Sequence, residues 1–140
     1  MEESRQNPGG RAKIVGEGSV MPSGGPGPEI MAASTLARDD VYNLANEKLG
    51  TVHEIMIDVP RGRIAYVVLS HGGILGVGDK LFAIPWTAVT LDTDRHCFLL
   101  DIDVQRLKAA EGFDQDNWPR MADVAWATKL HDYYDQPPYW

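Results

Sequence analysis

The sequence predicts a small, mainly β domain in the form of a barrel, followed by two short helices. Short apolar runs recur between residues 41 and 102, and turn-forming residues separate them without an intervening helical pattern. Such a spacing of short strands is typical of small β-barrels. A hydrophobic content of 44% in 140 residues is enough for one core of this kind.

Residues 1–34 differ in composition from the rest of the chain. They contain no aromatic residue, and eleven glycines and prolines fall between Pro8 and Pro28. A segment of this composition buries too little apolar surface to offset the conformational entropy that ordering would cost. We therefore predict a disordered leader over 1–34, a barrel domain over 35–112 and a C-terminal extension over 113–140.

Five apolar runs of strand length make up the predicted barrel. The second and third form a hairpin, and Ile55, Ile57 and Val59 share one face of its first strand. The third run is apolar on both faces, so other parts of the fold should cover each side of it. In chain order the runs are Val41–Asn43, Thr51–Val59, Ile64–Leu69, Leu81–Ile84 and His96–Ile102.

A glycine-rich connection precedes the fourth strand. Gly73 and Gly78 have the separation of the phosphate-binding motif GxxxxGK[ST], but Asp79 stands where that motif requires lysine. A phosphate loop also needs a helix to begin at the lysine, whereas a β-rich stretch follows here. We predict no nucleotide site and interpret the segment as a structural strand connection. Its key residues are Gly72, Gly73, Gly76, Gly78, Asp79, Pro85 and Trp86.

Two helical patterns follow the last strand. Asp103 is a candidate N-cap for a short helix, and Gly112 is a candidate stop. After a polar link, a second helix should run from about Asp123 to Tyr134, because apolar residues recur there at helical spacing. This second helix belongs to an aromatic-rich C-terminal extension, which holds three of the four tryptophans.

The apolar stripe on the second helix needs a surface to lie on, because a helix of this length is marginal alone. We expect its receptor on the two-sided strand, either of the same chain or of a partner chain in a two-fold dimer. We favour a homodimer, because so small a barrel exposes more apolar wall than one short helix covers. The predicted interaction surface consists of Tyr66, Val68, Trp126, Leu130, Tyr133 and Trp140.

The charge balance and the single cysteine narrow the range of functions. Thirteen basic and twenty acidic residues give a formal net charge of −7, which argues against direct binding to nucleic acid or to anionic lipid. The sequence has no apolar run long enough for a transmembrane segment and no signal-peptide core, so we expect a cytoplasmic protein. Cys97, as the single cysteine, excludes an internal disulfide and a cysteine-based metal site.

No group of titratable residues in the sequence has the spacing expected of an active site. His96 and Cys97 are neighbours on a predicted strand, so their side chains should point to opposite faces. His131 and Asp132 are neighbours on a predicted helix, where we expect a solvated face. The acidic residues between 92 and 103 have the outline of a calcium loop, but Cys97 stands where that loop requires glycine. We predict no enzyme, no metal and no cofactor.

Five motifs in the strands and their connections occur in a fixed order. They are Val41-Tyr-Asn…Glu47-Lys-Leu-Gly50, Ile55-Met-Ile-Asp58, Gly62-Arg-Ile-Ala-Tyr-Val-Val-Leu69, Gly72-Gly73…Gly76-Val-Gly-Asp-Lys80 and Phe82-Ala-Ile-Pro-Trp86. Over about residues 36–105 the chain resembles the PRC-barrel domain, a family that includes the photosynthetic reaction centre H subunit and the C-terminal domain of RimM-type ribosome-maturation factors. The tail resembles the extension of a stand-alone bacterial subgroup labelled reaction-centre H-subunit-like.

This resemblance implies a PRC-type β-barrel that acts as an assembly or protein-interaction module, with no catalytic residues to carry over. The sequence does not name the protein partner, and we expect self-association as a homodimer. Peripheral association with a membrane complex is compatible with the resemblance. The alternative is a barrel that binds a small ligand or cofactor, linked to photosynthetic or stress electron transfer. One departure is Asn46, where the family often has glycine; asparagine is the residue that best replaces glycine in a left-handed conformation.

Overall fold

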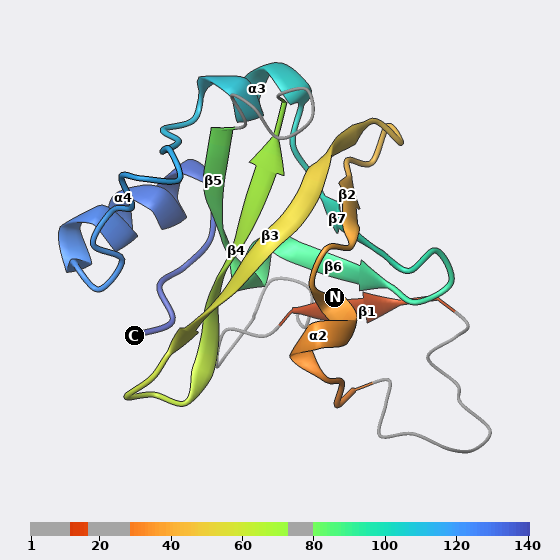
Figure 1. The fold of residues 1–140 in the computed structure, drawn as a ribbon, viewed down its shortest axis with the longest axis horizontal. Helices are drawn as coiled ribbons and strands as arrows, with labels where there is room; N and C mark the ends of the chain where they lie inside the picture. The colour runs from red at the N-terminus through yellow and green to blue at the C-terminus, as the bar shows by residue number, and fades with distance from the viewer. Residues whose placement is uncertain (1–11, 17–28, 73–79) are drawn as a thin grey trace.

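The computed structural model describes residues 12–16, 29–72 and 80–140 (Figure 1). In this part the protein is mainly β, with one seven-stranded sheet and three short α-helices. The strands are β1 (Lys13–Val15), β2 (Asp40–Tyr42), β3 (Lys48–Asp58), β4 (Arg63–His71), β5 (Lys80–Pro85), β6 (Val89–Asp92) and β7 (Cys97–Leu100). The helices are α2 (Ala33–Leu36), α3 (Val104–Ala109) and α4 (Val124–Tyr133), and a 3₁₀ turn covers Trp86–Ala88.

The strands are ordered β1-β6-β7-β2-β3-β4-β5 across the sheet. Neighbours are antiparallel except β1 with β6 and β2 with β7, which are parallel. In the described part of the chain, the outer strands β1 and β5 do not pair with each other, so the sheet is open. The prediction of a mainly β fold is confirmed, whereas a closed barrel is not seen.

Strand β4, which lies between β3 and the edge strand β5, is buried on both faces, as its sequence predicts. Every residue from Ala65 to Leu69 is buried. Tyr66 lies under α4, where its ring contacts those of Trp126 and His131. Because successive side chains alternate across a strand, Val67 faces the opposite side, and it is buried there too.

The end of strand β3 is irregularly paired with β4 and is exposed at the tip of the hairpin. Its register against β4 shifts twice, between Val52 and Glu54 and between Met56 and Ile57. At the first shift the extra residue is His53 on β3, and at the second it is Ala65 on β4. Ile55 packs partly against the core, whereas Ile57 is exposed near the end of the strand and Val59 is exposed in the turn that follows it.

Strand β1 lies within the segment predicted to be disordered. Lys13–Val15 pairs with Thr90–Asp92 of β6, a strand that the sequence analysis also missed, and α2 begins at Ala33. The prediction of disorder is therefore wrong for β1 and for the start of α2. Residues 1–11 and 17–28 of that segment lie outside the described part.

The two C-terminal helices begin where they were predicted. The Asp103 carboxylate accepts the amide of Gln105, and the Asp123 carboxylate accepts the amide of Ala125, each at 2.9 Å. Helix α3 nevertheless ends at Ala109, three residues before the predicted glycine stop. Gly112 instead allows a close approach, because a Cβ atom there would lie 2.8 Å from the Leu81 carbonyl oxygen. Asn46 has the predicted left-handed conformation, with φ 64°.

Candidate functional site

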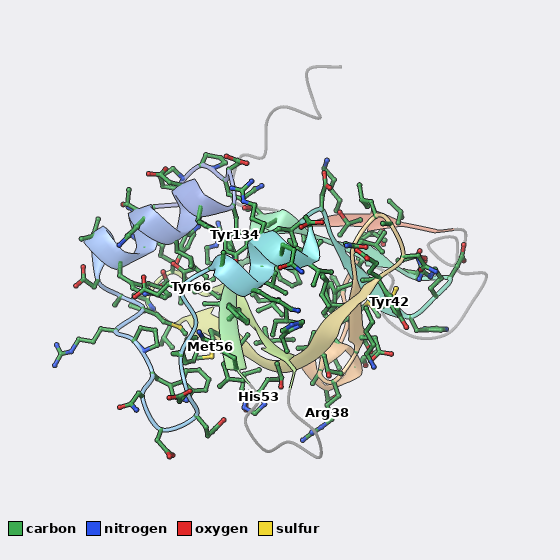
Figure 2. All side chains as sticks on the ribbon, turned by 90° about the horizontal axis from the view of Figure 1, so that it is seen from above. Arg38, Tyr42, His53, Met56, Tyr66 and Tyr134 are labelled. Carbon is green, nitrogen blue, oxygen red and sulfur yellow. The ribbon has the colours of Figure 1, made fainter. Side chains whose placement is uncertain are left out.

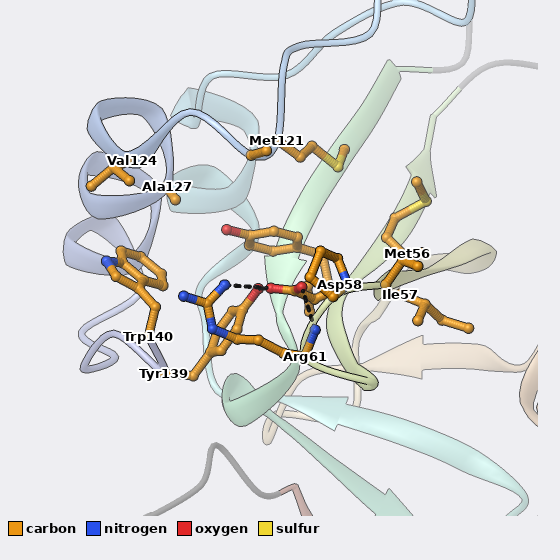
Figure 3. A pocket seen from close by; sticks show the side chains of 14 residues that line it. Met56, Ile57, Asp58, Arg61, Met121, Val124, Ala127, Tyr139 and Trp140 are labelled. Carbon is orange, nitrogen blue, oxygen red and sulfur yellow. Dashed lines mark hydrogen bonds and ion pairs between the residues drawn. The ribbon is translucent and has the colours of Figure 1, made fainter.

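A groove of about 360 Å³ lies between the β3–β4 hairpin and the C-terminal part of the chain (Figure 3). We call it the hairpin groove. Residues Met56–Arg61 at the end of the hairpin form one wall, and α4 with the loop before it forms another, through Met121 and Val124. Tyr139 and Trp140 of the C-terminal tail line it as well.

Large apolar side chains are exposed along the hairpin groove. Seven large hydrophobic residues are exposed in the described part of the chain, and four of them line this groove. Their exposed fractions are 59% for Ile57, 80% for Val59, 60% for Val124 and 37% for Trp140. Single exposed apolar residues are ordinary, but their gathering along one groove is typical of a binding surface.

The polar end of the groove is built around Asp58. Its carboxylate accepts hydrogen bonds from the Tyr139 hydroxyl at 2.6 Å and from the Arg61 guanidinium at 3.1 Å. The Tyr139 bond is the main cause that holds the pKa of Asp58 below its usual value. Burial, together with this bond, raises the pKa of Tyr139 to about 12. At neutral pH the carboxylate is therefore charged and the phenol neutral, and the charges of Asp58 and Arg61 offset each other.

The C-terminal tail is fixed to both walls of the groove. The Arg63 guanidinium lies 4.2 Å from the centre of the Tyr139 ring, a cation–π distance. The Trp140 ring meets the ring of His131 on α4 edge-on, with centroids 5.0 Å apart. These contacts hold the exposed face of Trp140 in place beside the hairpin.

His131 is buried below the groove, and the predicted solvated face at this position is wrong. Its side chain is 1% exposed, and its Nδ1–H donates a hydrogen bond of 2.8 Å to the Ala127 carbonyl. The ring packs edge-on against Tyr66, at 5.6 Å between centroids. Burial lowers the pKa of His131, so the imidazole is neutral and serves as part of the packing.

Most of the predicted interaction surface lies inside the single chain. Tyr66, Val68 and Leu130 are buried, and Trp126 and Tyr133 are half-buried. Figure 2 shows Tyr66 between α4 and the sheet. Trp140 is the member that is exposed. The stripe on α4 thus lies on its own chain, which is one of the two arrangements that the sequence left open.

Three exposed residues of the groove were not predicted as part of an interaction surface: Ile57, Val59 and Val124. Ile57 lies near the end of β3 and Val59 in the turn that follows, so both are exposed at the tip of the hairpin. Val124 is the first residue of α4 and lies outside the apolar stripe. A valine directly after an N-cap aspartate was the available signal, because that position commonly faces solvent.

The predicted glycine connection is described only at its ends. Gly72 has a left-handed backbone with φ 81°, Pro85 ends β5 and Trp86 begins the 3₁₀ turn. The remaining predicted residues of this connection lie outside the described part: Gly73, Gly76, Gly78 and Asp79.

The other candidate residues do not assemble into a reactive site. His96 lies in the turn before β7 with φ 53°, so its predicted place on a strand is wrong. Cys97 is buried, and burial raises the pKa of its thiol, which keeps it protonated and unreactive. Across residues 12–16, 29–72 and 80–140, no three His, Cys, Asp or Glu side chains group together as metal ligands would.

A family model described as the PRC-barrel domain matches residues 28–104, which is more than half of the chain. The chain belongs to the PRC-barrel domain family. This domain is, in general, a non-catalytic module for interaction and assembly. No curated protein shows significant similarity to the chain. The match includes the β3–β4 hairpin and ends before α4, so the hairpin groove lies between the PRC-barrel domain and the C-terminal extension.

No helix in the described part of the chain has the length and apolar character needed to cross a bilayer.

Proposed function

We propose that the protein is a non-enzymatic interaction module of the PRC-barrel type that self-associates as a homodimer through the hairpin groove. The observation that carries this proposal is the gathering of Ile57, Val59, Val124 and Trp140 along one groove. A two-fold axis at the groove would set the hairpin of one copy against the helix and tail of the other, and the reverse. Both copies would then cover their exposed apolar side chains.

Charge opposes a second copy less at the hairpin groove than elsewhere on the surface. The whole chain carries a formal charge of −7, so two copies repel each other over most of their surfaces. In the lining of the groove, Asp58 and Arg61 are the charged residues, and they form a salt bridge of 3.1 Å. This lining therefore presents an apolar, locally neutral face, where contact between two acidic chains is opposed least.

The test is the mass of the protein in solution, measured by light scattering at high micromolar concentration. We expect the wild type to be a dimer and Val59→Asp to be a monomer with an unchanged thermal melt. Leu44→Asp is the matched control, because Leu44 is also exposed, at 67%, but does not line the groove. A wild type that stays monomeric, or a Val59→Asp variant that stays dimeric, contradicts the proposal.

A second candidate function is the binding of a small ligand or cofactor, linked to photosynthetic or stress electron transfer. The volume of the groove favours it, since about 360 Å³ falls within the range of roughly 300–1,000 Å³ typical of small-molecule sites. Native mass spectrometry and an absorption spectrum of protein purified from its host test this alternative. A bound molecule that is lost in Val59→Asp supports it, whereas colourless protein of the bare chain mass supports the interaction module.

A further inference from the structure

The outer edge of strand β6 is covered by a segment from far away in the sequence (Figure 1). Strand β1 pairs with β6 in parallel, and Ile14 is aligned with Leu91. Just beyond the paired residues, Thr93 donates its backbone amide at 2.9 Å and its hydroxyl at 3.2 Å to the Val15 carbonyl oxygen. An uncovered strand edge is a template for pairing with another chain. Residues 12–16 thus occupy a place where an external strand could bind.

The edge of β6 fits its occupant closely. Gly16 has φ 110°, and a Cβ atom there would lie 2.7 Å from the Thr93 hydroxyl oxygen. The edge therefore requires glycine directly after the strand. Ala12 and Ile14 pack partly against the core, and Lys13 and Val15 are exposed. The occupant has the pattern of a small residue, an aliphatic residue two positions later and a glycine two positions after that.

Strand β1 is held by few contacts and is suited to exchange. It is three residues long, pairs on one side only, and its aliphatic anchor Ile14 is half-buried. Ordering the five residues 12–16 has a cost in backbone entropy. The burial of one half-buried side chain stabilises the segment by less than this cost. Segments with little buried apolar surface open locally far more often than the core does.

We propose that the edge of β6 is a strand-acceptor site for an extended, basic segment of a partner protein, and that residues 12–16 occupy this site in the free chain. Main-chain hydrogen bonds would give affinity, and the pocket for the aliphatic side chain and the space for glycine would give selectivity. Charge indicates a basic partner: Asp92 and Asp94 flank the site in an acidic chain, the guanidinium of the neighbouring Arg95 is bonded to Asn46, and the present occupant contributes Lys13.

This site is separate from the hairpin groove. β1 and β6 lie at one end of the sheet, whereas α4 contacts β5 at the other end. The proposal therefore does not depend on self-association through the groove, and either proposal can fail without the other.

The test uses the full chain and a fluorescent peptide with the sequence of residues 10–18 as the probe. In the wild type, β1 competes with the peptide at a high effective concentration, so binding should be weak. Gly16→Val strains the left-handed backbone, frees the edge and should strengthen peptide binding about tenfold or more. Gly62→Val is the matched control, because Gly62 also has a left-handed φ of 65° but lies in the β3–β4 turn. This control should bind the peptide as weakly as the wild type.

Two further variants make the result decisive. Ile14→Ser removes the aliphatic anchor of β1 without backbone strain and should strengthen peptide binding by the same factor. The proposal can then be tested even if Gly16→Val does not fold. Thr93→Pro, added to either variant, removes the amide that bonds the strand and should abolish the gain. The proposal is overturned if both β1 variants bind the peptide no better than the wild type, or if the gain survives Thr93→Pro. It is also overturned if Gly16→Val converts a wild-type dimer to a monomer, because the occupant would then be a second copy.

Discussion

Replacing His131 by phenylalanine should reduce the acid sensitivity of the protein. The imidazole lies buried between α4 and β4, and it donates a hydrogen bond to Ala127 and packs against Tyr66. Burial is the main cause that lowers its pKa below the ordinary 6.5, and the nearby Arg63 guanidinium acts in the same direction. The Ala127 bond and the Asp132 carboxylate oppose this shift without reversing it.

The sign of the effect follows from proton binding in the two states. As the pH falls below 6.5, His131 takes up a proton in the unfolded chain, while in the folded chain it stays neutral down to its lowered pKa. Within that window the unfolded state binds more protons, so the free energy of unfolding decreases as the pH falls. The titration of one residue changes the free energy of unfolding by at most about 1.4 kcal/mol per pH unit. Between pH 7.5 and 5.5 the loss from His131 can therefore reach about 1.4 kcal/mol.

Urea unfolding at pH 7.5 and pH 5.5 measures this loss directly. Phenylalanine keeps a ring between α4 and the sheet but has no proton to gain, so the pH-dependent loss should shrink by up to about 1.4 kcal/mol in His131→Phe. His53→Phe is the control for the change of residue type, because His53 is exposed on β3, and the loss should shrink more in His131→Phe than in this control. Equal losses in His131→Phe and the wild type would refute the reasoning.

Three further variants test separate parts of the fold. Gly50→Ala should destabilise the protein by more than about 2 kcal/mol in urea unfolding, because the added Cβ would lie 2.1 Å from the Ser70 carbonyl oxygen; a variant as stable as the wild type contradicts this. Asp123→Ala removes the N-cap of α4 and should lower the free energy of unfolding by about 1 kcal/mol. An unchanged urea midpoint would show that the cap is not needed. Tyr139→Phe should raise the pKa of Asp58 toward its ordinary value in an NMR titration of the carboxyl carbon, since the Tyr139 hydroxyl is the main cause of its low pKa. An unchanged pKa of Asp58 would show that this hydrogen bond is not the cause.

Local sequence signals predicted the features of this fold that depend on neighbouring residues. The two-sided apolar run became the buried strand β4, and the N-cap aspartates Asp103 and Asp123 fixed the starts of α3 and α4. Asn46 took the left-handed turn conformation expected of an asparagine at a glycine position. In each case a residue type acts through its own backbone or its immediate neighbours, so the pattern alone is sufficient.

Features that depend on distant contacts were not predictable in the same way. The bond between Asp58 and Tyr139 joins residues 81 positions apart, and it closes the polar end of the hairpin groove. His131 is polar by type, and only its packing under the tail makes it part of the interior. Strand β1 is three residues in a glycine- and proline-rich segment, and its partner β6 lies more than seventy positions away. No local periodicity encodes such pairings.

The central claim is that the hairpin groove is the surface through which two copies meet. The most direct test is a dilution series followed by NMR, with signals assigned for the methyl groups and the tryptophan side chains. We predict that dilution from millimolar to low micromolar concentration shifts the signals of Ile57, Val59, Val124 and Trp140, while the signals of the exposed Leu44 stay unchanged. Signals that do not move in the groove, or that move at Leu44 instead, would contradict it.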